Sequence, residues 1–225
     1  MQSSSPWHAE QTVAGFASSP PNEILVGYAA AEGQRAGVAR LLDLGCGAGR
    51  NAVPLAQGGW RVAGIDTSKP MLDAMRRRAL DEDVSDRVAG HLARMDALPF
   101  RDRSFQLVVA HGIWNLARSG AEFRAAVREA ARVSTPGAGL FLFTFSRNTL
   151  SPDAAPVPGE AFVFTQFSGQ PQCFLTETQL LDELAAAGFS RDPAVPLSEY
   201  NLPRPGAVRA GKVPVIYEVA FRRTG

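Results

Sequence analysis

The sequence predicts an α/β protein built on one mostly parallel sheet with helices on both faces. From Arg40 to Phe145, short apolar runs of strand length alternate with segments of helical periodicity. Such alternation is typical of a parallel sheet whose crossover helices cover both of its sides. The first apolar run ends at a glycine-rich turn, as a buried parallel strand does before a helix. The last apolar run, residues 215–221, follows a loop, so we expect that strand to be antiparallel.

Composition limits the class of protein and its partners. The 225 residues are 45% hydrophobic and 20% charged, which suits one large domain and excludes a disordered chain. A net charge of +1 argues against a nucleic-acid partner. No lysine or arginine precedes Arg35 and no apolar run exceeds strand length, so we predict no signal peptide, no membrane partner and a cytoplasmic location. The two cysteines match no metal-binding pattern, so no metal site is predicted.

The first half of the predicted sheet lies between residues 38 and 110. Residues 38–44, 61–65, 87–94 and 105–110 are predicted strands, and residues 22–31 and 49–57 are predicted helices. Residues 1–6 are expected to form an irregular polar start. Ser68 is expected to cap a further helix with Pro70 in its first turn. The inner face of that helix consists of Met71, Leu72, Met75 and Ala79.

The second half of the predicted sheet does not follow this regular alternation of strands and helices. An amphipathic helix around residues 123–130 is expected to end at Pro136-Gly137, before a strand over residues 139–145. Residues 146–172 contain several prolines and an alternating aromatic patch. Thr176 and Gln179 then match a capping box that opens another helix. The inward residues of that helix are Leu180, Leu181 and Leu184.

The most informative stretch is residues 42–51, Leu-Asp-Leu-Gly-Cys-Gly-Ala-Gly-Arg-Asn. Glycines between a strand and a helix let a ligand approach bare backbone, and the helix N-terminus offers free N–H groups. Residues 47–52 also match the dinucleotide fingerprint GxGxxA, so a nicotinamide or flavin enzyme is an alternative. A tight turn that binds no ligand is the structural alternative.

Three carboxylates stand at the ends of successive predicted strands. Asp43 precedes the glycines, where it repels a pyrophosphate but attracts the ammonium group of an amino-acid ligand. Asp66 ends the second strand, at the spacing where a carboxylate binds ribose hydroxyls. Asp96 follows the third strand and can accept a hydrogen bond from an adenine amino group. Together these carboxylates argue against a dinucleotide as the ligand of the glycine-rich turn.

With these motifs in place, residues 40–145 resemble the core of the class I S-adenosylmethionine-dependent methyltransferases. The DxGxGxG of residues 43–49, Asp66 and Asp96-Ala97 stand where that family has them. Residues 96–105 are most similar to the ubiquinone- and menaquinone-biosynthesis group, and residues 49–51 to the tellurite-resistance and thiopurine group. Gln106 is a departure, because the related groups usually place an acid there. The resemblance implies a Rossmann-like fold of seven strands with the last one antiparallel.

The resemblance also implies the cofactor S-adenosylmethionine, with S-adenosylhomocysteine as product. It divides the chain into an N-terminal cap segment, residues 1–37, and a methyltransferase domain, residues 38–225, with substrate-lid insertions at 146–175 and 193–214. The implied cofactor-binding residues are Asp43, Gly45, Cys46, Gly47, Asn51, Asp66, Thr67, Met71, Met95, Asp96, Ala97 and His111.

Two residues after the fourth strand are candidates for the methyl-transfer step, because open sheets bind ligands at this edge. His111 is either a general base, suited by a pKa near neutrality, or a backbone contribution beside the cofactor. Trp114 either shields the sulfonium by a cation–π contact or forms pocket wall. In the family, the acceptor's nucleophile displaces the methyl group in line, and a base is needed only when that nucleophile arrives protonated.

Aromatic residues in the loops predict the substrate pocket. We expect Phe162, Phe164 and Phe167 to line a lid over an apolar small molecule, although a hairpin packed on the core gives the same pattern. The further pocket candidates are Trp7, Phe16, Trp114 and Tyr200, with plain terminus, wall and loop surface as the alternatives.

The lead hypothesis for function is methyl transfer from S-adenosylmethionine to a small molecule. A nicotinamide-dependent oxidoreductase that shares the glycine loop and a non-catalytic cofactor-binding protein are the alternatives. The segment after the fourth strand lacks the Asn/Asp-Pro-Pro-aromatic turn of the enzymes that methylate nucleic-acid amines. The residues leave the accepting atom open among O, N, S, Se, Te and C.

Overall fold

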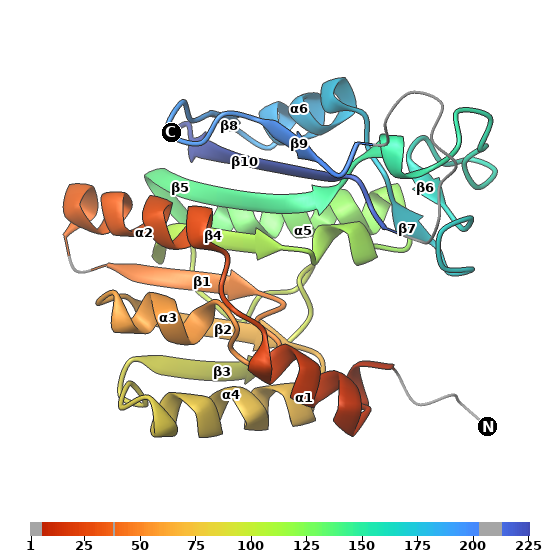
Figure 1. Cartoon of the computed structure of the whole chain (residues 1–225). Coiled ribbons are helices and arrows are strands. Elements are labelled where there is room, and N and C mark those ends of the chain that lie inside the picture. Colours follow the sequence, from red (N-terminus) through yellow and green to blue (C-terminus); the bar gives the residue numbers. More distant parts are fainter. Residues whose placement is uncertain (1–5, 38, 203–212) are drawn as a thin grey trace.

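The computed structural model describes residues 6–37, 39–202 and 213–225. Its main sheet has the order β3-β2-β1-β4-β5-β10-β8, and the first five strands are parallel. These five are β3 (Val88–Leu92), β2 (Arg61–Asp66), β1 (Arg40–Leu44), β4 (Phe105–His111) and β5 (Ser134–Phe145). Their carboxyl ends all point to one edge of the sheet, on the right of Figure 1.

The last strand, β10 (Ile216–Arg223), is antiparallel to β5, as predicted. Two short strands share its other side, each antiparallel to it: β8 (Phe189–Arg191) and β9 (Ser198–Tyr200). The seventh position of the sheet is therefore divided between two strands. A small hairpin lies outside the sheet and consists of β6 (Val163–Phe164) and β7 (Gln172–Cys173).

Helices cover both faces of the sheet, which confirms the predicted layering (Figure 1). The apolar sides of α2 (Glu23–Ala36), α3 (Ala52–Gln57) and α4 (Lys69–Asp81) pack with residues such as Leu41 and Val109 on one face. The apolar sides of α5 (Gly120–Val133) and α6 (Glu177–Ala186) pack with Leu42 and Val108 on the other. No helix in the described part of the chain is long and apolar enough to cross a membrane.

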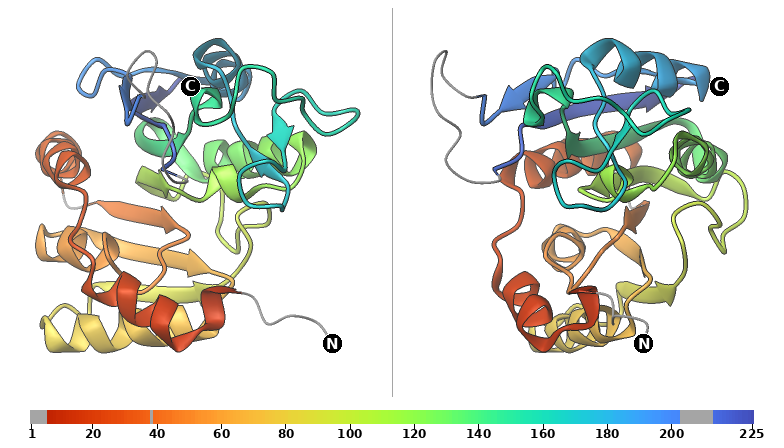
Figure 2. Two further views of the ribbon diagram at one scale, coloured as in Figure 1. Left: turned by 45° about the vertical axis from the view of Figure 1, so that its right-hand side comes forward. Right: turned by 90° about the vertical axis from the view of Figure 1, so that its right-hand side faces the viewer.

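Two peripheral segments flank the carboxyl edge of the sheet (Figure 2). At one side lie η1 (Pro6–His8) and α1 (Glu10–Ser18), which packs on α4. At the other side lies the insertion that contains η3 (Arg147–Thr149) and the β6–β7 hairpin. Between them, η2 (Trp114–Leu116) follows β4.

Local chemistry accounts for the elements that match the predictions. The Ser68 hydroxyl accepts a hydrogen bond from the Met71 N–H at the start of α4. Thr176 and Gln179 form both hydrogen bonds of the capping box that begins α6. The predicted inner face of α4 is buried at Met71, Leu72, Met75 and Ala79.

Three segments differ from the prediction. α3 begins at Ala52 and not at residue 49, because Gly47 and Gly49 have φ angles of +52° and +82°, which a right-handed helix excludes. β5 begins at Ser134, before Pro136-Gly137, where its register against β4 shifts and the ladder tolerates a proline. Residues 10–18 form α1, where no helix was predicted. Residue 38, the predicted start of β1, and residues 203–212 of the second predicted insertion lie outside the described residues.

Candidate active site

A pocket of about 790 Å³ opens at the carboxyl edge of the sheet, and both Trp7 of η1 and the turn of the β6–β7 hairpin line it. It lies where doubly wound sheets bind ligands, outside the ends of the parallel strands. Residues that follow β1, β2, β3 and β4 form most of its wall. Six residues that the sequence predicted for the site line this pocket: Trp7, Gly45, Asp66, Thr67, Met95 and Asp96.

The glycine turn gives the pocket a bare backbone surface. Gly45 has a φ angle of +68°, and a Cβ atom there would lie 2.8 Å from Cδ1 of Ile113, which also lines the pocket. Only glycine therefore fits that position without displacing the pocket wall. The Gly47 N–H donates to Oδ2 of Asp66 at 3.0 Å and ties the turn to the end of β2.

Two carboxylates lie under the turn and dominate its electrostatics. Asp43 is buried, and its carboxylate accepts no hydrogen bond from any described residue. Burial and the neighbouring Asp66 raise the pKa of Asp43 to about 7. Asp66 is better compensated, since it accepts the Gly47 N–H and the Ser68 N–H at 3.0 and 2.7 Å, although burial still raises its pKa. An unpaired buried carboxylate beside a second one favours a ligand that carries positive charge.

A second group of charges lies at the end of β3. Arg94 holds both oxygens of Asp96, at 2.8 and 2.7 Å, and also contacts Glu122 at 3.0 Å. The hydrogen bond from Arg94 lowers the pKa of Asp96, so this carboxylate is ionised at neutral pH. A bidentate partner leaves further lone pairs on the carboxylate and fixes its plane. Ala97, predicted beside it, is exposed and does not line the pocket.

The structure contradicts the interpretation of His111 as a general base. Its ring stacks on Phe143, with centroids 4.2 Å apart, and its Nε2 lies 3.2 Å from Nδ2 of Asn22. Asn22 caps α2 through Oδ1, so its amide nitrogen must face His111 and Glu218. Nε2 of His111 is therefore an acceptor that is already engaged. Burial and nearby Arg50 lower the pKa of His111 to about 4.

Three other predicted cofactor-binding residues do not line the pocket with their side chains. The Cys46 side chain is buried against Gly64, and burial raises the pKa of its thiol well above the usual range. Met71 packs under the turn with residues of α1. Asn51 is buried, and its Oδ1 accepts the Asn22 N–H at 3.1 Å. Each of these side chains is engaged in the core or with the N-terminal segment, and the cofactor-binding role of the three residues stays a prediction.

Of the aromatic residues predicted for the substrate pocket, some lie at the pocket and others lie elsewhere. Trp7 lines the pocket, and Phe16 lies against it in an edge-to-face contact, near Gly47. Trp114 is fully buried, so its side chain neither shields a sulfonium nor forms part of the pocket wall. Tyr200 lies outside the pocket, where its hydroxyl donates to buried Glu218 at 2.8 Å.

The phenylalanines of the hairpin do not line the pocket, so the predicted aromatic lid is wrong. Phe162 packs edge-to-face on Phe123 in the core between the sheet and α5. Phe164 and Phe167 pack on Phe174 in a satellite cluster. The polar turn of the same hairpin faces the pocket instead, through Ser168, Gln170, Pro171 and Gln172.

Several lining residues escaped the sequence analysis. Arg94, Arg118 and Glu122 line the pocket. Glu122 is the third residue of α5, and its Oε2 accepts the Arg118 N–H at 2.8 Å. The available signal was the position of residues 112–122 directly after β4, where any lining side chain must come from the strand-to-helix connection.

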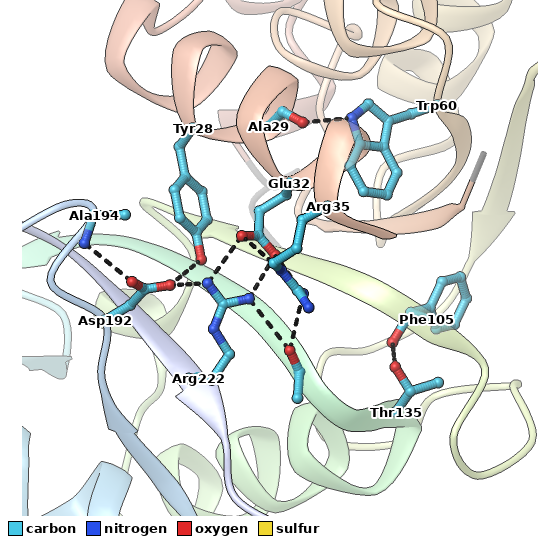
Figure 3. Close-up of polar contacts among 11 residues, drawn as sticks. Tyr28, Ala29, Glu32, Arg35, Trp60, Phe105, Thr135, Asp192, Ala194 and Arg222 are labelled. Atoms are coloured by element: carbon cyan, nitrogen blue, oxygen red, sulfur yellow. Dashed lines mark hydrogen bonds and ion pairs between the residues drawn. The ribbon is translucent and has the colours of Figure 1, made fainter. Parts of the chain in front are cut away.

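A buried ionic network lies at the opposite, amino edge of the sheet and is separate from the pocket (Figure 3). Arg222 at the end of β10 contacts Glu32 of α2 at 2.5 and 2.9 Å and also contacts Asp192. The Tyr28 hydroxyl donates to Asp192 at 2.9 Å, and Arg35 contacts Glu32 at 2.7 Å. This network attaches α2 to the edge of the sheet.

The fold and the pocket define a class of protein. Strands in the order 3-2-1-4-5 followed by an antiparallel last strand, with a glycine turn after β1 and acids after β2 and β3, form the class I S-adenosylmethionine-dependent methyltransferase fold. Comparison with known proteins gives the same class. Residues 41–137, less than half of the chain, match a family described as methyltransferase domain.

The chain is similar to curated proteins of that class. It is 32% identical over 165 residues, 73% of its length, to 27-O-demethylrifamycin SV methyltransferase of Amycolatopsis mediterranei. It is 36% identical over 114 residues, 50% of its length, to demethylmenaquinone methyltransferase of Renibacterium salmoninarum. The aligned part covers 58% and 44% of those two relatives, so the chain spans about half of their length.

Solved structures share the fold. A [4+2]-cyclase has a TM-score of 0.66 at 19% identity, over 89% of this chain and 80% of that chain. The 1,6-didemethyltoxoflavin-N1-methyltransferase of Burkholderia thailandensis, solved with S-adenosylhomocysteine, has a TM-score of 0.63 at 20% identity, over 89% and 78%. One fold thus includes a methyltransferase and a cyclase, and the pocket residues must decide the reaction.

Proposed function

We propose that this chain transfers the methyl group of S-adenosylmethionine to a small-molecule acceptor. The observation that carries the proposal is the unpaired, buried Asp43 under a glycine turn, with Asp66 beside it. A pyrophosphate of a dinucleotide would meet two carboxylates there, whereas S-adenosylmethionine carries an ammonium and a sulfonium. The bare backbone at Gly45 supports the same ligand, because a side chain would fill its place.

The residues that would hold the cofactor follow from this placement. Asp43 would neutralise the ammonium group, Asp66 would accept the ribose hydroxyls, and Asp96 would accept the adenine amino group. Gly45 and Gly47 would admit the ligand to the backbone. The adjoining predicted contacts are Thr67 and Met95, which line the pocket, and the backbone of Ala97.

The bound cofactor supplies an electrophilic methyl group on a sulfonium. The chain supplies alignment of the acceptor and exclusion of water by η1 and the hairpin turn. His111 is engaged by Asn22, and no histidine of the described residues lines the pocket. We therefore propose that the acceptor reacts as an anion or loses its proton to solvent.

The names of the relatives support a small-molecule acceptor, since they act on rifamycin, menaquinone and toxoflavin precursors. A volume of about 790 Å³ is in the range of small-molecule sites. The insertion at residues 146–175 would act as the lid through its polar turn, and a cytoplasmic location stays a prediction.

Replacement of Asp66 by Ala tests the placement of the cofactor. We expect the affinity for S-adenosylhomocysteine, measured by calorimetry, to fall about ten- to a hundredfold, because charge-assisted hydrogen bonds are worth ~1.5–3 kcal/mol. Exposed Asp86→Ala is the control and should bind normally. NAD should not bind the unmodified protein. Normal S-adenosylhomocysteine affinity in folded Asp66→Ala, or binding of NAD, would contradict the proposal.

The N-terminal cap segment gives a second test. Trp7 lines the pocket, and its carbonyl accepts the Ser68 hydroxyl at 2.9 Å, which attaches η1 to the start of α4. Trp7→Ala should weaken S-adenosylhomocysteine binding about three- to tenfold, the size of one aromatic contact. Leu80→Ala removes an exposed apolar side chain outside the pocket and should change nothing. Equal affinities of the two variants for S-adenosylhomocysteine would show that the N-terminal segment does not contact the cofactor.

A further inference from the structure

The charged groups of the pocket are paired, with one exception. Asp66 accepts backbone N–H groups, and Arg94 joins Asp96 to Glu122. Arg118 lines the same pocket, is exposed, and its guanidinium makes no hydrogen bond or ion pair with any described residue. Its backbone is held by Glu122, so the side chain extends from a fixed point.

A second unpaired donor lies at the start of β7. Gln172 is nine-tenths buried and lines the pocket. Its Oε1 accepts the Ser168 hydroxyl at 2.7 Å, and Ser168 in turn accepts the Gln170 N–H at 3.3 Å. In this arrangement the amide oxygen of Gln172 is the atom engaged with Ser168. The Nε2 atom then carries two N–H donors that no described residue accepts.

The side chains of Arg118 and Gln172 extend from backbone segments that lie next to each other. Cys173 Sγ donates to the Ala117 carbonyl at 3.4 Å, so β7 lies against the end of η2. Gln172 precedes Cys173, and Arg118 follows Ala117. At this end of the pocket, Arg118 and Gln172 therefore offer unpaired donors, with one full positive charge.

We propose that the methyl acceptor carries a carboxylate, which the Arg118 guanidinium and the Gln172 amide hold. This inference rests on the proposed methyl transfer and adds the chemical class of the acceptor. A guanidinium fork matches the two oxygens of a carboxylate, and the amide donors of Gln172 supply further hydrogen bonds. Apolar neighbours Leu116 and Pro171 provide space for the body of the acceptor. An uncharged analogue leaves the Arg118 guanidinium without a counter-charge and offers the Gln172 donors weaker acceptors.

The test uses protein saturated with S-adenosylhomocysteine and ligand-observed NMR titration. The probes are 4-hydroxybenzoate, 3,4-dihydroxybenzoate and 4-hydroxyphenylacetate, each against its own primary amide. We expect the acids to bind about tenfold or more tightly than the amides, as charge-assisted hydrogen bonds predict. Arg118→Gln should abolish this preference, Arg118→Lys should retain part of it, and Gln172→Leu should reduce it.

Arg128→Gln is the matched control, because Arg128 is exposed on α5 and lies outside the pocket. It should keep the full preference for acids. Equal binding of acids and amides, no binding of any acid, or a preference that persists in Arg118→Gln would overturn the proposal. A loss of S-adenosylhomocysteine affinity in Arg118→Gln would also overturn it, by placing Arg118 on the cofactor. Failure of the unmodified protein to bind S-adenosylhomocysteine would instead reject the proposed function.

Discussion

Arg222→Leu is expected to lower the free energy of unfolding by about 3–5 kcal/mol, because it leaves two buried carboxylates without their shared cation. Glu32 and Asp192 are only 4% and 6% exposed, and Arg222 contacts both (Figure 3). Arg35 still reaches Glu32, but among the described residues Asp192 keeps only the Tyr28 hydroxyl and the Ala194 N–H as donors. Urea titration followed by circular dichroism measures the change.

A matched control separates this buried network from an ordinary ion pair. Arg191 on neighbouring β8 pairs with Glu177, and both side chains are about half exposed. Arg191→Leu should therefore cost less than about 1 kcal/mol. A triple variant with Leu at positions 32, 192 and 222 should recover most of the lost stability, since no charge is left buried. Equal losses for Arg222→Leu and Arg191→Leu would show that the network adds nothing to stability.

The same network predicts a dependence on pH. Burial alone would raise the pKa of Glu32, but hydrogen bonds from Arg222 and Arg35 outweigh it and lower the pKa below its ordinary value of 4.5. The stability that Glu32 contributes is therefore present above pH 4.5 and is lost as the pH falls through the lower pKa of the folded state. The Arg222→Leu variant should lose part of this acid sensitivity.

Asp43→Asn is expected to stabilise the cofactor-free protein at pH 8 and to weaken cofactor binding. The pKa of Asp43 is about 7, above its ordinary value of 3.8, so the folded state favours the protonated form. As the pH rises from 4 to 7, the folded protein loses stability on the order of 4 kcal/mol, at 1.36 kcal/mol for each of about three pKa units. Asparagine, which has a similar shape and no charge, avoids this loss.

Thermal unfolding at several pH values and calorimetry with S-adenosylhomocysteine measure the two effects. At pH 4 the variant and the unmodified protein should have similar stability, and at pH 8 the variant should be more stable. Its affinity for S-adenosylhomocysteine at pH 8 should fall by about tenfold or more, because the ammonium group loses its partner. A variant that is less stable at pH 8, or that binds normally, would contradict the role of Asp43.

Local patterns in the sequence were sufficient to predict the main strands and helices. The period of the apolar residues predicted the strands and the inner face of α4, and the Thr176 capping box predicted the start of α6. The spacing of Asp43, Gly45 and Asp66 predicted the edge of the sheet at which the pocket lies. These features depend on residues a few positions apart, or on strand ends that any parallel sheet brings together.

Only the tertiary structure decided which side chains face the pocket. Asn22 engages His111 across 89 residues, and no periodicity indicates that contact. In the hairpin, the phenylalanines and the polar turn are a few residues apart, and both suited a lid. The sheet and α5 leave an apolar space that Phe162 fills, so the polar turn, with Gln172, faces the pocket. Burial favours the larger apolar surface, and which surface can be buried depends on elements distant in sequence.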